Sequence, residues 1–116
     1  LMNPQVIFLG TEIKLKIEME PHDDINMSDC DFILEAYSGN NKNKIILKKE
    51  GYYKDKAIIS SGENAYIFLI DSSQLGVGNL KCKLTLKVQD GDFNDYKRTE
   101  VSILNPNILI KDERML

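Results

Sequence analysis

Apolar and polar side chains alternate strictly along residues 78–88. Leucine, cysteine and valine occupy one face of this segment, and lysine and threonine occupy most of the other. The apolar positions are Leu80, Cys82, Leu84, Leu86 and Val88. A period of two predicts an antiparallel strand with one face in the core and one face in water. Residues 11–19 repeat the alternation, so the pattern favours an all-β chain.

Turn signals divide the remaining sequence into further strands. We expect strands over 11–19, 31–38, 45–49, 57–59, 65–70, 80–88 and 99–104. The run 39–44 predicts a hairpin turn, and 71–76 predicts one helical turn capped by Asp71 or Ser72. No predicted helix is long enough to cover a sheet, so a second sheet must do so. These roughly seven strands predict a single immunoglobulin-like antiparallel β-sandwich.

The length of 116 residues fits one domain. We expect a lead-in segment or edge strand over 1–10, the β-sandwich over 11–104 and an exit segment over 105–116, because Pro106 breaks strand pairing. The apolar run 6–9 is too short for a signal peptide, and no run approaches the roughly 20 apolar residues of a membrane span. We therefore expect no membrane insertion.

Charge and cysteine content narrow the function classes. The net charge is −3, and the lysines alternate along strands beside acidic loops, which disfavours binding to nucleic acid. Cys30 and Cys82 can either bridge the two sheets of a secreted sandwich or remain buried thiols. We favour buried thiols, because small secreted scaffolds usually carry more cysteines.

The sequence offers no catalytic constellation, so we predict that the chain is not an enzyme and needs no cofactor. His22 is the only histidine, and no cysteine or second histidine lies near it, which makes a poor set of ligands for a transition metal. The serine pairs at 60–61 and 72–73 lack the context of a nucleophile elbow.

An acidic loop at 90–95 is the best metal candidate. The side chains of Asp90, Asp92 and Asn94 match the first three ligands of a calcium loop, and Asp95 can extend the set. An EF-hand, however, needs glycine where Asp95 stands and glutamate where Val101 stands. We therefore favour an acidic turn held by Lys97 and Arg98, with no metal.

Aromatic residues offer a second kind of site. Tyr52, Tyr53, Phe93 and Tyr96 can form an exposed platform for a sugar or a protein partner, although packing at strand ends is the commoner role of such residues.

Two apolar segments suggest burial beyond one small core. The strand at 65–70 is apolar on both faces, which predicts a central strand with Ile67 and Leu69 available to a partner. The exit segment offers Ile108, Leu109 and Ile110. A second copy or a neighbouring domain would cover these residues, so we expect a homo-oligomer.

The segment from Ile70 to Val101 resembles small prophage structural proteins of gut bacteria. It is also similar in layout to the N-terminal sandwich domain of phage baseplate upper proteins. The matching features are Ile70-Asp71 before a helical turn, the Gly78-Asn79-Leu80 strand start, the acidic loop 90–95 and the return strand Arg98-Thr99-Glu100-Val101. The resemblance implies a non-enzymatic tail or baseplate module that assembles with itself and with other virion proteins. Its location would be the virion, or the bacterial cytoplasm during assembly. The alternative is an immunoglobulin-like surface domain that binds carbohydrate or protein.

Overall fold

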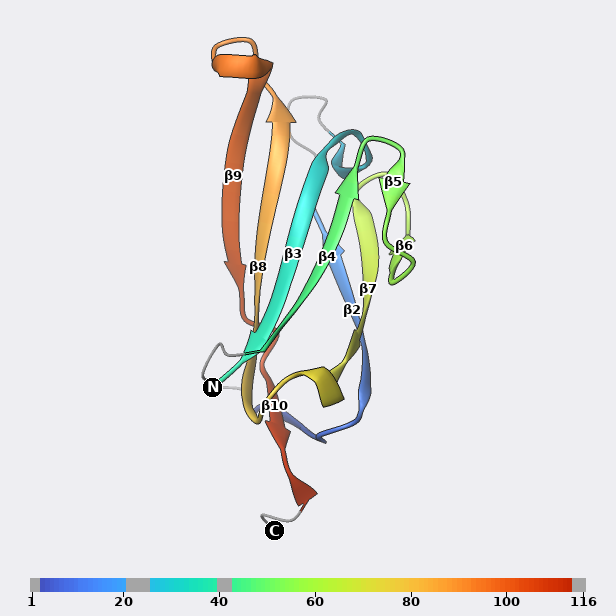
Figure 1. The fold of residues 1–116 in the computed structure, drawn as a ribbon, viewed down its shortest axis with the longest axis vertical. Helices are drawn as coiled ribbons and strands as arrows, with labels where there is room; N and C mark the ends of the chain where they lie inside the picture. Colours follow the sequence, from blue (N-terminus) through green and yellow to red (C-terminus); the bar gives the residue numbers. More distant parts are fainter. Residues whose placement is uncertain (1–2, 21–25, 40–42, 114–116) are drawn as a thin grey trace.

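The computed structural model describes residues 3–20, 26–39 and 43–113 and folds them into two β-sheets (Figure 1). The larger sheet has seven strands in the order β1-β10-β8-β3-β4-β5, and β9 pairs with β8 beside this path. Its strands are β1 (Gln5–Phe8), β3 (Asp31–Ser38), β4 (Lys44–Glu50), β5 (Tyr53–Lys54), β8 (Gly78–Gln89), β9 (Lys97–Leu104) and β10 (Ile108–Lys111). The prediction of an all-β chain is confirmed.

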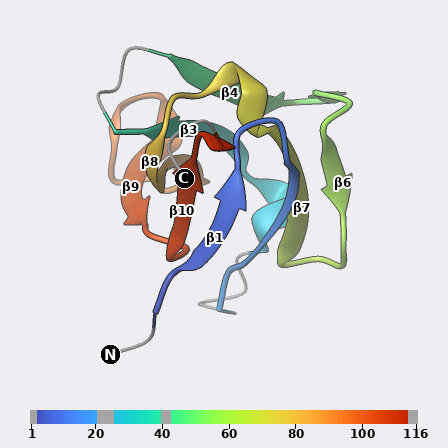
Figure 2. The same cartoon turned by 90° about the horizontal axis from the view of Figure 1, so that it is seen from below.

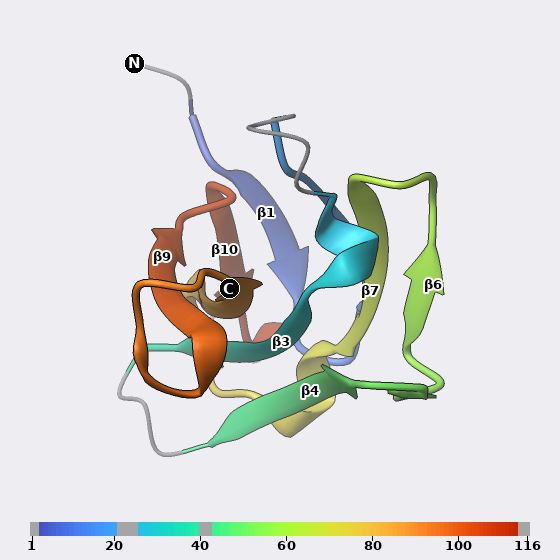
Figure 3. The same ribbon diagram turned by 90° about the horizontal axis from the view of Figure 1, so that it is seen from above.

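The smaller sheet has three strands in the order β2-β7-β6. They are β2 (Glu12–Glu18), β6 (Ile58–Ser60) and β7 (Ala65–Asp71). Seen from above, β6 and β7 lie on one side of the molecule and β9 lies on the other (Figure 3). The pairing is that of an immunoglobulin-type sandwich, in which strands B, E and D face strands C, F and G. Here β4 and β5 extend the sheet of β3 and β8, as the two additional strands of variable-type domains do.

The structure has ten strands where the sequence pattern predicted about seven. The additional strands are β1, β5 and β10. β1 and β10 pair in parallel with Gln5 opposite Ile108, and β10 also pairs with the start of β8 (Figure 2). The lead-in and exit segments therefore hold each other at one end of the larger sheet. Parallel strands from distant segments are not joined by a tight turn, so no local sequence signal predicts their pairing.

Three short 3-10 turns lie in the described connections between strands. They are η1 (Met27–Asp29), η2 (Ser72–Gln74) and η3 (Asn94–Tyr96). The predicted helical turn is η2, and the side chain of Asp71 caps it by accepting a hydrogen bond from the N–H of Ser73 at 3.0 Å. Leu75 follows η2 and is buried in the core.

The core lies between the two sheets and follows the predicted alternation. All five apolar positions of β8 are buried, and so are Phe32, Leu34 and Ala36 of β3. The ring of Phe32 meets that of Phe68 edge-on, with centroids 5.8 Å apart, and this contact joins β3 to β7. The segment 65–70 is central in its sheet, as predicted, because β2 and β6 pair with its two sides.

The start of β8 requires a glycine. Gly78 has a φ of +125°, and a Cβ atom there would lie 2.9 Å from the Cα of Gly39. The close approach of these two backbones fixes where β8 begins beside the end of β3. It thereby sets the register that carries β9 on the far side of β8.

Candidate functional site

A cavity of about 510 Å³ opens at one end of the larger sheet. It forms where β3 and β9 begin and where β4 ends, so side chains from separate parts of the chain converge there (Figure 1). Its lining consists of Asp31, Phe32, Ile33, Lys48, Lys49, Glu50, Thr85, Lys87, Asn94, Asp95 and Lys97. The lining combines acidic, basic and apolar side chains. Such a surface can recognise a partner that carries both polar and apolar groups.

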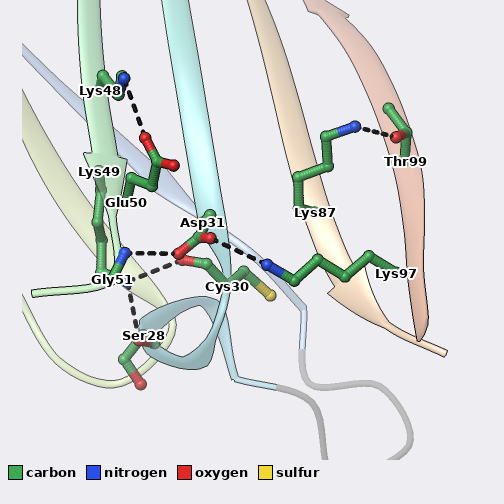
Figure 4. A network of polar contacts seen from close by, with 10 residues as sticks. All are labelled: Ser28, Cys30, Asp31, Lys48, Lys49, Glu50, Gly51, Lys87, Lys97 and Thr99. Atoms are coloured by element: carbon green, nitrogen blue, oxygen red, sulfur yellow. Dashed lines mark hydrogen bonds and ion pairs between the residues drawn. The ribbon is translucent and has the colours of Figure 1, made fainter. Parts of the chain in front are cut away.

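Asp31 organises the charges of the cavity. Its carboxylate accepts a hydrogen bond from the N–H of Gly51 at 2.9 Å and lies 3.5 Å from the Nζ of Lys97 (Figure 4). The N–H of Gly51, and then the positive charge of Lys97, hold the pKa of Asp31 below its usual value. The side chain therefore stays ionised and joins β3, the β4–β5 turn and β9.

Lys49 lies on the inner face of the larger sheet, opposite Phe32 in the strand register. Its Nζ donates hydrogen bonds to the carbonyl oxygens of Ser28 at 3.1 Å and Cys30 at 2.8 Å (Figure 4). It also lies 5.8 Å from the centroid of the Phe32 ring. These contacts attach the end of β4 to the segment that leads into β3. The charge of Lys49 is thus used within the fold.

The aromatic candidates are all exposed but occupy two separate places. Tyr52 and Tyr53 lie at the β4–β5 turn, whereas Phe93 and Tyr96 lie in the β8–β9 loop. Two to three strand spacings of the sheet separate the turn from the loop, which is about 10–14 Å. The four rings therefore lie in two groups and do not form one continuous platform, and none of them lines the cavity.

The acidic loop at 90–95 is held by arginine. Asp90 pairs with Arg98 at 2.5 Å and accepts a hydrogen bond from the N–H of Asp92 at 3.0 Å. Among the described residues, no group of three acidic, histidine or cysteine side chains is arranged to hold a metal ion. The loop matches the acidic turn that we favoured, although Lys97 pairs with Asp31 rather than with the loop. His22 lies outside the described residues.

Two of the interface candidates are used within the chain itself. Ile108 and Ile110 are buried in the core on β10, which pairs with β1, so the expectation that they dock on a neighbour is wrong for these side chains. β10 joins the larger sheet instead of leaving the domain, and only Leu109 of the three is partly exposed. Ile67 and Leu69 are half-buried on the outer side of the smaller sheet, opposite Lys16 and Lys14 of β2.

One face with exposed apolar residues was not apparent from the sequence. It is the side of the larger sheet that points away from the smaller sheet, and we call it the outer face. Its exposed apolar residues are Val101 (54%), Ile103 (60%), Ile33 (38%) and Ile46 (57%). Strand pairing aligns them in rows, one running Ile103–Lys83–Glu35–Ile46. The alternation in 99–104 contained the signal, but the sequence alone did not show that β9 lies at an edge.

Cys30 and Cys82 are buried free thiols, in line with the interpretation that we favoured. Burial raises the pKa of Cys82 to about 11 and also raises that of Cys30. Thiols of this kind are unreactive, because the thiolate is the nucleophile.

Comparisons with known proteins do not identify a family for the chain. In the part of the chain that the structure describes, no helix has the length and apolar character needed to cross a membrane. No protein-family model matches the chain, and no curated protein matches its sequence.

Proposed function

We propose that the chain is a non-enzymatic structural module of a phage or prophage tail or baseplate, which works by assembling with other protein subunits. The observation that carries the proposal is the outer face together with the β9 edge. Val101 and Ile103 are more than half exposed on β9, which pairs with β8 alone among the strands that the structure describes. Exposed apolar side chains gathered along one sheet are typical of a surface that a protein partner covers.

The resemblance to phage and prophage structural proteins is a second support for the proposal. Its residues, Ile70 to Val101, run through the end of β7, η2, β8, the acidic loop and the first half of β9. The same stretch therefore supplies both the family-like layout and the exposed strand. In the resembling proteins this stretch belongs to a sandwich that assembles into an oligomer.

The proposal is tested on particles from the cells that carry the gene. We expect the chain in density-gradient fractions that contain tails or complete particles, detected by mass spectrometry of tryptic peptides. An abundant cytoplasmic enzyme of the same cells serves as the control for contamination. If the chain is expressed but sediments only with soluble cell protein, the proposal is refuted.

The alternative is a surface domain that binds carbohydrate or protein, and one observation favours it. The rings of Tyr52 and Tyr96 are exposed, and residues near each of them in sequence, among them Glu50 and Asp95, line a cavity with charged side chains. Exposed aromatic rings near charged groups suit sugar recognition. A glycan array would show binding that is lost in Tyr96→Ala and retained in Ile59→Ala, which changes an exposed residue of the smaller sheet. An array without signal would count against the alternative.

A further inference from the structure

β9 is the longest strand of the larger sheet that has only one strand beside it. It spans eight residues and pairs with β8 alone among the described strands (Figure 1). Alternate residues of such a strand direct their N–H and C=O groups away from the sheet, where another strand can bind them. The strand contains no proline, and Val101 and Ile103 project from its outer face. Its free edge is a template for a further strand.

The other edges are short or protected by charge. β5 and β6 have two and three residues, and β1 has four. β2 has seven, but Lys14 and Lys16 occupy its outer side. An antiparallel pair of β2 strands centred on Lys14, Leu15 or Lys16 places lysine opposite lysine. Lysines on an edge strand are a common protection against pairing between chains.

The sequence of β9 fits a second copy of itself. In a continuous sheet, residues that face each other lie on the same side, so a two-fold axis perpendicular to the sheet passes midway between two copies of the same residue, one from each strand. Centring on Val101 pairs Arg98 to Leu104 of each copy, which is nearly the whole strand. Centring on Glu100 pairs a stretch of equal length but sets two glutamates against each other. Centres nearer the ends of the strand pair fewer residues.

The register centred on Val101 places no like charges opposite each other. Val101 faces Val101 and Thr99 faces Ile103 on the outer face. On the other side, Glu100 faces Ser102 and Arg98 faces Leu104. Pairs of β-branched residues across neighbouring strands stabilise a sheet, and here Thr99, Val101 and Ile103 of each copy form such pairs with the other copy.

We propose that two copies of the chain join through antiparallel pairing of their β9 strands, with Val101 of one copy opposite Val101 of the other. The larger sheets then form one sheet across the dimer. This inference rests on the proposed function, because it names the partner and the surface through which assembly begins.

Light scattering of the purified full chain over a range of concentrations tests the dimer. We expect the mass to rise toward twice 13.2 kDa for the native sequence. Val101→Lys and Val101→Glu each place like charges at the two-fold axis, so each variant should be monomeric. Ile46→Lys is the matched control, because it makes the same change at a similarly exposed residue on β4 and should leave the dimer intact. Circular dichroism of every variant verifies that it is folded.

Mixing the two Val101 variants tests the register. The lysine of one copy then faces the glutamate of the other, so the mixture should recover the dimer mass that neither variant shows alone. A native chain that stays monomeric, a Val101→Lys variant that still dimerises, or a mixture that stays monomeric would each overturn the inference. A monomeric native chain that nevertheless sediments with phage particles would refute the β9 dimer and leave the proposed function standing.

Discussion

Replacing Lys49 with methionine removes an ammonium group but keeps the apolar stem that packs beside Phe32. The native Nζ donates hydrogen bonds to the carbonyl oxygens of Ser28 and Cys30 at 3.1 and 2.8 Å. A hydrogen bond to a charged group contributes about 1.5–3 kcal/mol, and the nearby ring adds about 0.5–1 kcal/mol. Lys49 is only partly buried, so water replaces part of what is lost. We expect Lys49→Met to lower the free energy of unfolding by about 2–3 kcal/mol.

Lys48 provides the matched control on the same strand. Its Nζ lies 3.0 Å from a carboxylate oxygen of Glu50, but about half of each side chain is exposed. Exposed ion pairs of this kind contribute about 0.2–1 kcal/mol. Lys48→Met should therefore cost much less stability than Lys49→Met.

Urea unfolding at equilibrium measures both variants. Far-ultraviolet circular dichroism is the appropriate signal, because the chain has no tryptophan. Raising the salt concentration to about 1 M should reduce the cost of Lys48→Met more than that of Lys49→Met, because exposed charges are screened more strongly. If the two variants lose the same stability within about 0.5 kcal/mol, the argument that Lys49 joins β4 to the start of β3 is wrong.

Three further predictions concern the core, the thiols and the response to acid. Phe68→Ala should lower the free energy of unfolding by about 3–5 kcal/mol, and a loss below about 1 kcal/mol in urea unfolding would contradict its place between the sheets. Because burial raises the pKa of Cys82 to about 11, iodoacetamide at about pH 8 should leave it unmodified in the folded chain and label it in urea, as mass spectrometry can show; rapid labelling without urea would contradict this. The N–H of Gly51 and the charge of Lys97 lower the pKa of Asp31. Its ionised form therefore stabilises the fold at pH values above the unfolded pKa of about 3.9. This contribution is lost as the pH falls through the lower folded pKa. Asp31→Asn should therefore reduce stability at neutral pH and have little effect near pH 2 in thermal unfolding, whereas equal losses at both pH values would refute the assignment.

The strands and their inward faces were predictable because alternation is a local signal. In β8 every apolar position from Leu80 to Val88 is buried, and the intervening positions are exposed or half-buried. In β2 the same alternation predicts burial less well, because Ile13 is buried but Leu15 and Ile17 are only half-buried. β2 lies at the edge of the smaller sheet, and alternation carries no information about how well the opposite sheet covers a strand.

The cavity was not predictable, because it depends on pairing between distant strands. Asp31 and Lys97 are 66 residues apart in the sequence and meet only because β3 and β9 each lie close to β8. The parallel pairing of β1 with β10 was missed for the same reason. Asn107 has a φ of +61° in the short break between β9 and β10, and β10 then continues along β8 in the same direction as β9. In sequence, an exit segment that stays in its own sheet looks like one that leaves it.

Single-chain folding explains the apolar residues of β8 but not those of β9. The leucines of β8 are buried, so the core requires them. Val101 and Ile103 remain more than half exposed, and isolated exposed apolar residues need no special explanation, since β-branched residues favour strands anyway. Their position, however, is specific: they alternate on one face of an unpaired edge, where threonine or lysine would satisfy the same strand preference or protect the edge. β2, the other long edge, carries lysines at the corresponding outward positions. This contrast between the two edges is expected of a chain that pairs through β9 and avoids pairing through β2.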